Sequence, residues 1–117
     1  MLYFTEIKVR EIALRTVNSF IPLVMNISDT SVALEDLNNY TTDEIQKCNE
    51  MESTDLITDC ILVLLPEISD KRTEISNTFT EQMEAYNNLY NMSLEQVPKD
   101  VEEALKEAKD CTEPCTE

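Results

Sequence analysis

The stretch STDLITDCILVLLP, residues 53–66, decides the fold. Its apolar side chains recur at helical spacing, in two adjacent stripes along the stretch. The stripes contain Leu56, Ile57, Cys60, Ile61, Leu64 and Leu65, and Leu62 and Val63 add apolar surface on the other sides. A β-strand over residues 61–65 is the alternative, but the chain offers no second strand to pair with it. The spacing therefore predicts a helix, buried at the centre of the fold.

Helical spacing continues on both sides of this stretch, and glycine is absent from the 117 residues. A chain without glycine has no Asn-Gly or Asp-Gly hairpin and no glycine helix C-cap. Toward the N-terminus, one apolar face is predicted to turn inward. It comprises Val9, Ile12, Ala13, Val17, Phe20, Leu23 and Val24. The pattern as a whole indicates an all-α protein.

Polar caps and prolines predict where the helices begin and end. Residues 28–31 offer several N-caps, and Thr41 with Glu44 forms a capping box. The polar residues 53–55 restart the helical pattern. Pro66 and Pro98 are each suited to the first position of a helix. These signals divide the chain into about five helices. We expect a compact, disulfide-stapled helical bundle that forms a single domain over residues 1–117.

The charge is strongly negative and unevenly distributed. Nine basic and 24 acidic residues give a net charge of −15, yet residues 1–28 carry +1 and the remainder −16. Such a surface repels nucleic acid and anionic lipid and attracts basic protein surfaces. No apolar run reaches the length of a membrane span. We therefore expect a monomer that binds a host or partner protein with a basic surface, and neither nucleic acid nor membrane.

The four cysteines, Cys48, Cys60, Cys111 and Cys115, allow several interpretations. A four-cysteine zinc site usually presents two closely spaced pairs, and only Cys111 and Cys115 approach that spacing. A redox pair favours a helix N-terminus, whereas Cys111 is expected near a helix C-terminus. Free buried thiols in a cytosolic protein are a third possibility. We favour two structural disulfides in a secreted domain and no metal site.

The pairing of these cysteines is constrained by helix geometry. Twelve residues of continuous helix would hold Cys48 and Cys60 about 18 Å apart, beyond the roughly 7 Å limit for a disulfide. That pair would need a sharp turn at residues 52–55. Cys60 and Cys111 both lie on stripes that are expected to face the core. We therefore favour Cys60 with Cys111 and Cys48 with Cys115.

Three Asn-X-Ser/Thr sequences are possible glycosylation sites. They begin at Asn26, Asn39 and Asn91, each of which falls at a predicted helix junction. Surface acceptors of this kind are glycosylated only on the secretory route. They add support to an extracellular location, and the expected product is a secreted glycoprotein.

Motifs for catalysis are missing from the sequence. Histidine is absent, which removes the usual general base and the commonest metal ligand. There is no glycine-rich phosphate loop and no Ser-His-Asp or Cys-His set. Adjacent carboxylates such as Glu35 and Asp36 point about 100° apart on a helix, which is typical of a solvated face. We expect no enzymatic activity, no catalytic residues and no cofactor.

A small, acidic, glycine-free helical chain with cysteines at 48, 60, 111 and 115 resembles the anophensin and albicin family of anopheline mosquito salivary proteins. The resemblance covers the whole chain and implies a salivary inhibitor of a host plasma cascade. Its targets would be the alternative complement pathway or the contact system. No diagnostic motif carries a binding residue across from that family.

A carrier of a small lipophilic ligand in the helical core is the alternative function. Met25, Met51, Met83 and Met92 could line such a pocket together with the tyrosines, although methionine and aromatic stripes are more often core. Insect odorant-binding proteins have this role, but they typically contain six cysteines with a C-x3-C in the middle of the chain. Here the C-x3-C is terminal.

Overall fold

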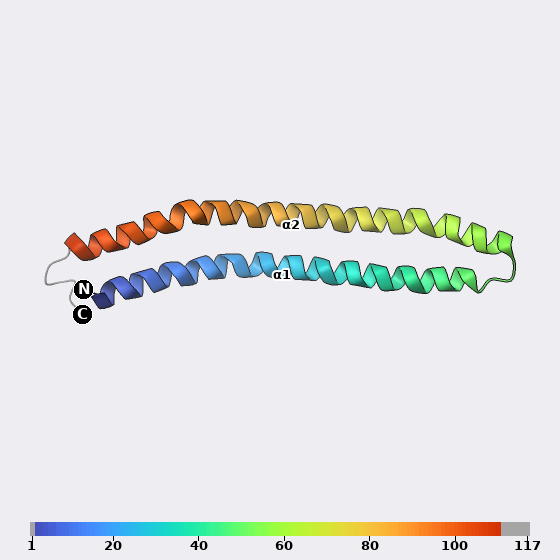
Figure 1. Ribbon diagram of the computed structural model, residues 1–117, viewed down its shortest axis with the longest axis horizontal. Coiled ribbons are helices and arrows are strands. Elements are labelled where there is room, and N and C mark those ends of the chain that lie inside the picture. Colours follow the sequence, from blue (N-terminus) through green and yellow to red (C-terminus); the bar gives the residue numbers. More distant parts are fainter. Residues whose placement is uncertain (1, 111–117) are drawn as a thin grey trace. The chain divides into compact units, whose positions relative to one another are not determined.

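Two long helices make up the fold in the computed structural model, which describes the backbone of residues 2–110. Helix α1 spans Leu2–Asn49 and helix α2 spans Thr54–Asp110. Residues 50–53 form the loop between them (Figure 1). The prediction of an all-α protein is confirmed. The predicted compact bundle of about five helices is wrong, because the chain forms two helices that continue through the expected junctions.

The expected N-caps inside α1 serve the continuing helix instead. The hydroxyl of Thr30 lies 3.1 Å from the carbonyl oxygen of Asn26, and the hydroxyl of Thr41 donates to the carbonyl of Leu37 at 2.8 Å. Both contacts join a residue to the residue four positions earlier. Threonine can make this bond within a helix as readily as it caps one, so the hydroxyl alone does not mark a boundary.

The prolines also fail to end the helices. Pro22 lies inside α1, and Pro66 and Pro98 lie inside α2. A proline in a helix interior removes one backbone hydrogen bond and crowds the carbonyl four residues earlier. All three prolines lie on exposed sides of their helices, where water can satisfy the freed carbonyl group. The loss of one backbone hydrogen bond at each proline is therefore tolerated, and each helix continues.

The loop that separates the two helices within residues 2–110 ends in an N-cap for α2. The Ser53 hydroxyl accepts a hydrogen bond from the backbone N–H of Leu56 at 3.2 Å, which makes Ser53 the N-cap of α2. Asp55 in the first turn of α2 and Lys47 in the last turn of α1 complement the helix dipoles. The restart of the helix that the sequence predicts at residues 53–55 is thus confirmed.

Contacts divide the chain into two compact units. The terminal unit contains residues 2–24 of α1 and 84–110 of α2, and the loop unit contains residues 25–83. Within each unit, a segment of α1 lies antiparallel to a segment of α2 (Figure 1). In the terminal unit, the rings of Phe20 and Tyr86 meet edge to face across this seam, 5.3 Å apart.

Each unit has a thin core, because two helices can bury only the stripe along which they meet. The buried apolar side chains are Ile12, Ala104 and Ala108 in the terminal unit and Leu37, Cys48 and Leu64 in the loop unit. The prediction that Val17 and Val24 turn inward is wrong, since both are about half exposed. Residues 53–66 are not a buried centre either. Leu56, Leu62, Val63 and Leu65 are all exposed there.

Within residues 2–110, neither helix contains a stretch that is long and apolar enough to cross a membrane.

Candidate interaction surface

A disulfide bond fixes the end of the loop unit at which the chain reverses. Cys48 in the last turn of α1 is bonded to Cys60 in the second turn of α2, with the two Cα atoms 5.5 Å apart. Cys48 is only 2% exposed, so the bridge lies inside the seam. Loop residues 50–53 supply the reversal that this pairing requires. The bridge holds the two helix ends and the loop in one fixed arrangement.

The observed bond corrects the predicted pairing. A cysteine forms one disulfide, so Cys48 and Cys60 cannot pair with Cys115 and Cys111 as we expected. A bond between Cys48 and Cys60 needs a sharp turn, which the sequence places near residues 52–55, and the loop at residues 50–53 supplies it. Cys111 and Cys115 lie outside the described residues.

Acidic side chains surround this disulfide. We call residues 43–59 the acidic loop end; it contains six carboxylates and one basic residue, Lys47. The carboxylates belong to Asp43, Glu44, Glu50, Glu52, Asp55 and Asp59, and all except Glu44 are exposed. Lys47 donates to Glu44 at 3.0 Å, and this hydrogen bond and the charge of Glu44 raise the pKa of the ammonium group. Lys47 thus offsets one carboxylate and leaves the others uncompensated.

Three exposed large apolar side chains lie among these charges. They are Ile45 near the end of α1, Met51 in the loop and Leu56 in the first turn of α2. Apolar contact area bordered by charges is typical of a surface that binds another protein. The acidic loop end therefore combines a disulfide-linked backbone, a strong negative charge and a few exposed apolar side chains.

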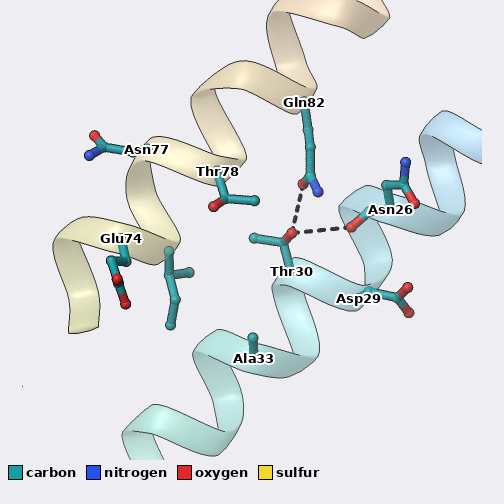
Figure 2. A pocket seen from close by; sticks show the side chains of 9 residues that line it. Asn26, Asp29, Thr30, Ala33, Glu74, Asn77, Thr78 and Gln82 are labelled. Carbon is teal, nitrogen blue, oxygen red and sulfur yellow. Dashed lines mark hydrogen bonds between the residues drawn. The ribbon is translucent and has the colours of Figure 1, made fainter.

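A second feature of the loop unit is an open hollow of about 580 Å³ beside the helix seam, which Figure 2 shows from close by. Asn26, Asp29, Thr30 and Ala33 line it from α1, and Glu74, Ile75, Asn77, Thr78 and Gln82 line it from α2. In Figure 2, Thr30, Thr78 and Gln82 turn toward one another, whereas Asp29 and Asn77 point away.

Thr30, which lines this hollow, is a polar residue buried in the seam between the helices. Its side chain is 7% exposed, and its hydroxyl oxygen lies 2.7 Å from the side-chain oxygen of Gln82 on α2. The carbonyl of Asn26 lies 3.1 Å away on the other side. A buried hydroxyl with such partners avoids the cost of desolvation. Thr30 and Gln82 thus stabilise the pairing of the helices and do not form a reactive pair.

Among the side chains that the structure describes in the terminal unit, one ion pair joins the two helices. A guanidinium nitrogen of Arg15 lies 2.7 Å from a carboxylate oxygen of Asp100, and the amide of Gln96 donates to the same carboxylate at 2.8 Å. Asp100 is the more buried partner, while Arg15 is mostly exposed. This arrangement holds the two helices together and pairs the carboxylate of Asp100 with two donors.

The predicted glycosylation residues do not lie at helix junctions. Asn26 and Asn39 lie inside α1 and Asn91 inside α2, and all three side chains are exposed. The predicted positions relative to helix ends were wrong because the junctions themselves do not exist. Their exposure leaves each one accessible at the surface.

The methionines that could have lined an internal pocket are mostly at the surface. Met25, Met51 and Met92 are exposed, and Met83 is half-buried. Sequence analysis missed Thr30 with Gln82 and the clustering of carboxylates around the disulfide. The first depends on a contact across the seam and had no signal in the sequence. The second was visible as a run of acidic residues between Asp43 and Asp59.

Comparison with protein-family models, curated proteins and solved structures finds no match to this chain. The resemblance to the anophensin and albicin family therefore stays a prediction.

Proposed function

We propose that this chain is a secreted, non-enzymatic binding protein that contacts a basic protein surface through the acidic loop end. The observation that carries the proposal is the set of exposed carboxylates gathered around the Cys48–Cys60 bond. Charges held on a fixed backbone lose little conformational freedom when they bind, so more of their interaction energy contributes to affinity. Their shared sign also accelerates encounter with a basic partner.

The disulfide supports an extracellular site of action. Structural disulfides persist in oxidising compartments and are rare in the cytosol. Cys48 and Cys60 form such a bond at a position where it fixes the proposed contact surface. The exposed acceptor residues Asn26, Asn39 and Asn91 are compatible with passage through the secretory route.

The resemblance to salivary inhibitors suggests the class of partner. We propose a protein of a host plasma cascade, in the alternative complement pathway or the contact system. Proteins of this kind are inhibited without chemistry when a bound protein covers a docking surface. Shape and charge are sufficient for that role, and the acidic loop end supplies both.

The test is inhibition of the two cascades in plasma. The oxidised protein is added to plasma, and alternative-pathway complement deposition and contact activation are followed at low and raised salt. We expect inhibition of one cascade, weakened by salt because screening reduces charge attraction. No inhibition of either cascade at any protein concentration would reject the cascade proposal.

Matched variants test the contact surface. The variant Glu50→Gln, Glu52→Gln, Asp59→Asn removes three charges from the acidic loop end. The control Glu35→Gln, Glu81→Gln, Asp70→Asn makes the same chemical changes at exposed positions elsewhere in the loop unit. We expect the first to weaken inhibition at least tenfold and the control to change it less than threefold. Equal effects would show that net charge, and not this surface, determines binding.

A further inference from the structure

Helix α1 has a second apolar stripe, on the side away from its partner helix in the terminal unit. Its members are Ile7 at 36% exposure, Leu14 at 62%, Val17 at 55%, Ile21 at 46% and Val24 at 51%. Ile12, which is 8% exposed, belongs to the seam with α2. This segment of α1 is therefore apolar on two faces, and only one of them is covered by α2. We call the uncovered residues the outer stripe.

The spacing of the outer stripe is that of a coiled coil. Positions 7, 10, 14, 17, 21 and 24 alternate in steps of three and four along α1. These steps are the a and d positions of a heptad, which places the side chains on one narrow strip. Arg10 is the single polar residue in the series, and its guanidinium extends to Glu6 at 2.6 Å. A strip of this kind packs well against another helix with the same spacing.

The distribution of charge along the chain indicates what binds to the outer stripe. Residues 1–28 carry a net charge of +1, whereas the rest of the chain carries −16. Two copies of this protein repel each other over most of their surfaces, but this repulsion is nearly absent along the outer stripe. The stripe is also self-complementary, which a two-fold symmetric contact requires. A second copy of the chain satisfies both the spacing and the charge.

We propose that the protein forms a two-fold symmetric, antiparallel dimer through the outer stripes of two α1 helices. In this orientation Arg10 of one copy faces the Ile21 level of the other, and the two guanidinium groups stay about 16 Å apart along the axis. A parallel pairing would stack Arg10 on its counterpart. The expectation of a monomer rested on total charge, and the outer stripe lies where that charge is missing.

The size of the stripe sets the strength of the dimer. The 18 residues from Ile7 to Val24 extend about 26 Å along a single helix face, so the area they can bury is small compared with the roughly 1,200 Å² that stable interfaces bury. The dimer is therefore transient, with a dissociation constant on the order of 10–100 μM. This contact is independent of the acidic loop end, which belongs to the loop unit.

Sedimentation equilibrium of the oxidised full-length chain tests the dimer, over about 1–500 μM protein. We expect a reversible monomer–dimer equilibrium that strengthens as salt screens the net charge. Binding through the acidic loop end weakens with salt, so the opposite salt dependence separates failure of this proposal from failure of the proposed function. A monomer at every protein and salt concentration would overturn the dimer.

Charge-neutral variants test the surface. Leu14→Gln with Ile21→Gln is expected to raise the dissociation constant at least tenfold. The control Leu62→Gln with Val63→Gln alters two exposed apolar residues in the loop unit and is expected to change it less than twofold. Circular dichroism checks that both remain helical. If the variant Leu14→Gln, Ile21→Gln still dimerises as the wild type does, or if the control variant loses affinity to the same extent, the dimer does not form through the outer stripe and the proposal is contradicted.

A gain in affinity provides a second test that does not depend on disrupting the helix. Arg10→Leu fills the polar position of the outer stripe and is expected to lower the dissociation constant about fivefold to tenfold. An unchanged or raised dissociation constant would show that position 10 lies outside the contact, and would overturn the proposed register.

Discussion

At the scale of single residues, local hydrogen bonds decide how polar side chains are accommodated on two helices. Tyr40 on α1 lies beside Glu67 and Lys71 on α2. Its phenol donates to Glu67 at 3.1 Å, and the ammonium of Lys71 lies over its ring, 4.5 Å from the centre. The hydrogen bond to Glu67 raises the pKa of Tyr40 above its ordinary value, and desolvation and the charge of Glu67 act in the same direction.

The variant Glu67→Gln is therefore expected to lower the pKa of Tyr40 toward the ordinary value of about 10. NMR titration of ¹³C-labelled tyrosine measures the midpoint, and Tyr40→Phe assigns the signal. Because the pKa is raised in the folded state, Tyr40 contributes stability below the unfolded pKa, and this contribution is lost as pH rises through the folded value. Glu81→Gln is the control for the loss of one charge. Equal midpoints in all three proteins would contradict the hydrogen bond.

At the scale of helices, the disulfide between Cys48 and Cys60 is the main covalent constraint within the described residues. The two residues are 12 positions apart, so the bond closes a short loop in the unfolded chain. The double variant Cys48→Ala, Cys60→Ala is expected to lower the free energy of unfolding by about 3 kcal/mol. Urea titration followed by circular dichroism measures this change. A loss below about 1 kcal/mol would mean that the bridge does not restrict the unfolded chain as loop entropy requires.

Replacing a proline inside a helix is expected to raise stability, whereas removing the disulfide is expected to lower it. Pro66 lies on the exposed side of α2, where an alanine would restore the helix hydrogen bond to the carbonyl of Leu62. Pro66→Ala is expected to raise the free energy of unfolding by about 1–2 kcal/mol, since the gain in the helix is partly offset by a more flexible unfolded chain. Thermal unfolding measures it, with Pro98→Ala as a parallel case in the terminal unit. A lower melting temperature in both variants would show that the prolines shape the helices favourably.

These helices also show how far the sequence predicts the fold. The helical class and the break at residues 53–55 could be predicted, because apolar spacing and the Ser53 cap are local features. The number of helices could not. Thr41 has the sequence signature of a cap but bonds backward to Leu37, and Pro66 has that of a first position but lies mid-helix. In each case the local sequence is compatible with a helix start and with a helix interior, and packing along the seam decides between the two.

The candidate surface was predictable only in part. The run of carboxylates between Asp43 and Asp59 is evident in the sequence, and so is the suggestion that acidity attracts a basic partner. The disulfide between Cys48 and Cys60 was not favoured, because it needs a sharp turn at residues 52–55 and because Cys60 was expected to meet Cys111 on a core-facing stripe. Burial was overestimated because a five-helix bundle would cover stripes such as Val17 and Val24, whereas α2 covers only one face of α1.

At the scale of the molecule, net charge limits stability and guides association. The charge of −15 is carried mainly by residues 29–117, since residues 1–28 contribute +1. The four ion pairs among the described residues use few of the 24 acidic side chains. Most carboxylates therefore repel one another. The repulsion is stronger in the folded state, where the charges are close together, than in the unfolded chain, where they are farther apart. Repulsion of this kind favours unfolding and is weakened by salt.

Raising sodium chloride from about 10 mM to 300 mM is therefore expected to increase the free energy of unfolding, by about 1 kcal/mol. Urea titrations at each salt concentration measure it, on the Leu14→Gln, Ile21→Gln background and at low micromolar protein, so that dimerisation does not contribute. Potassium chloride should give the same increase if screening is the cause. Stability that falls with salt would mean that the few ion pairs, led by Arg15 with Asp100, outweigh the repulsion among the unpaired carboxylates.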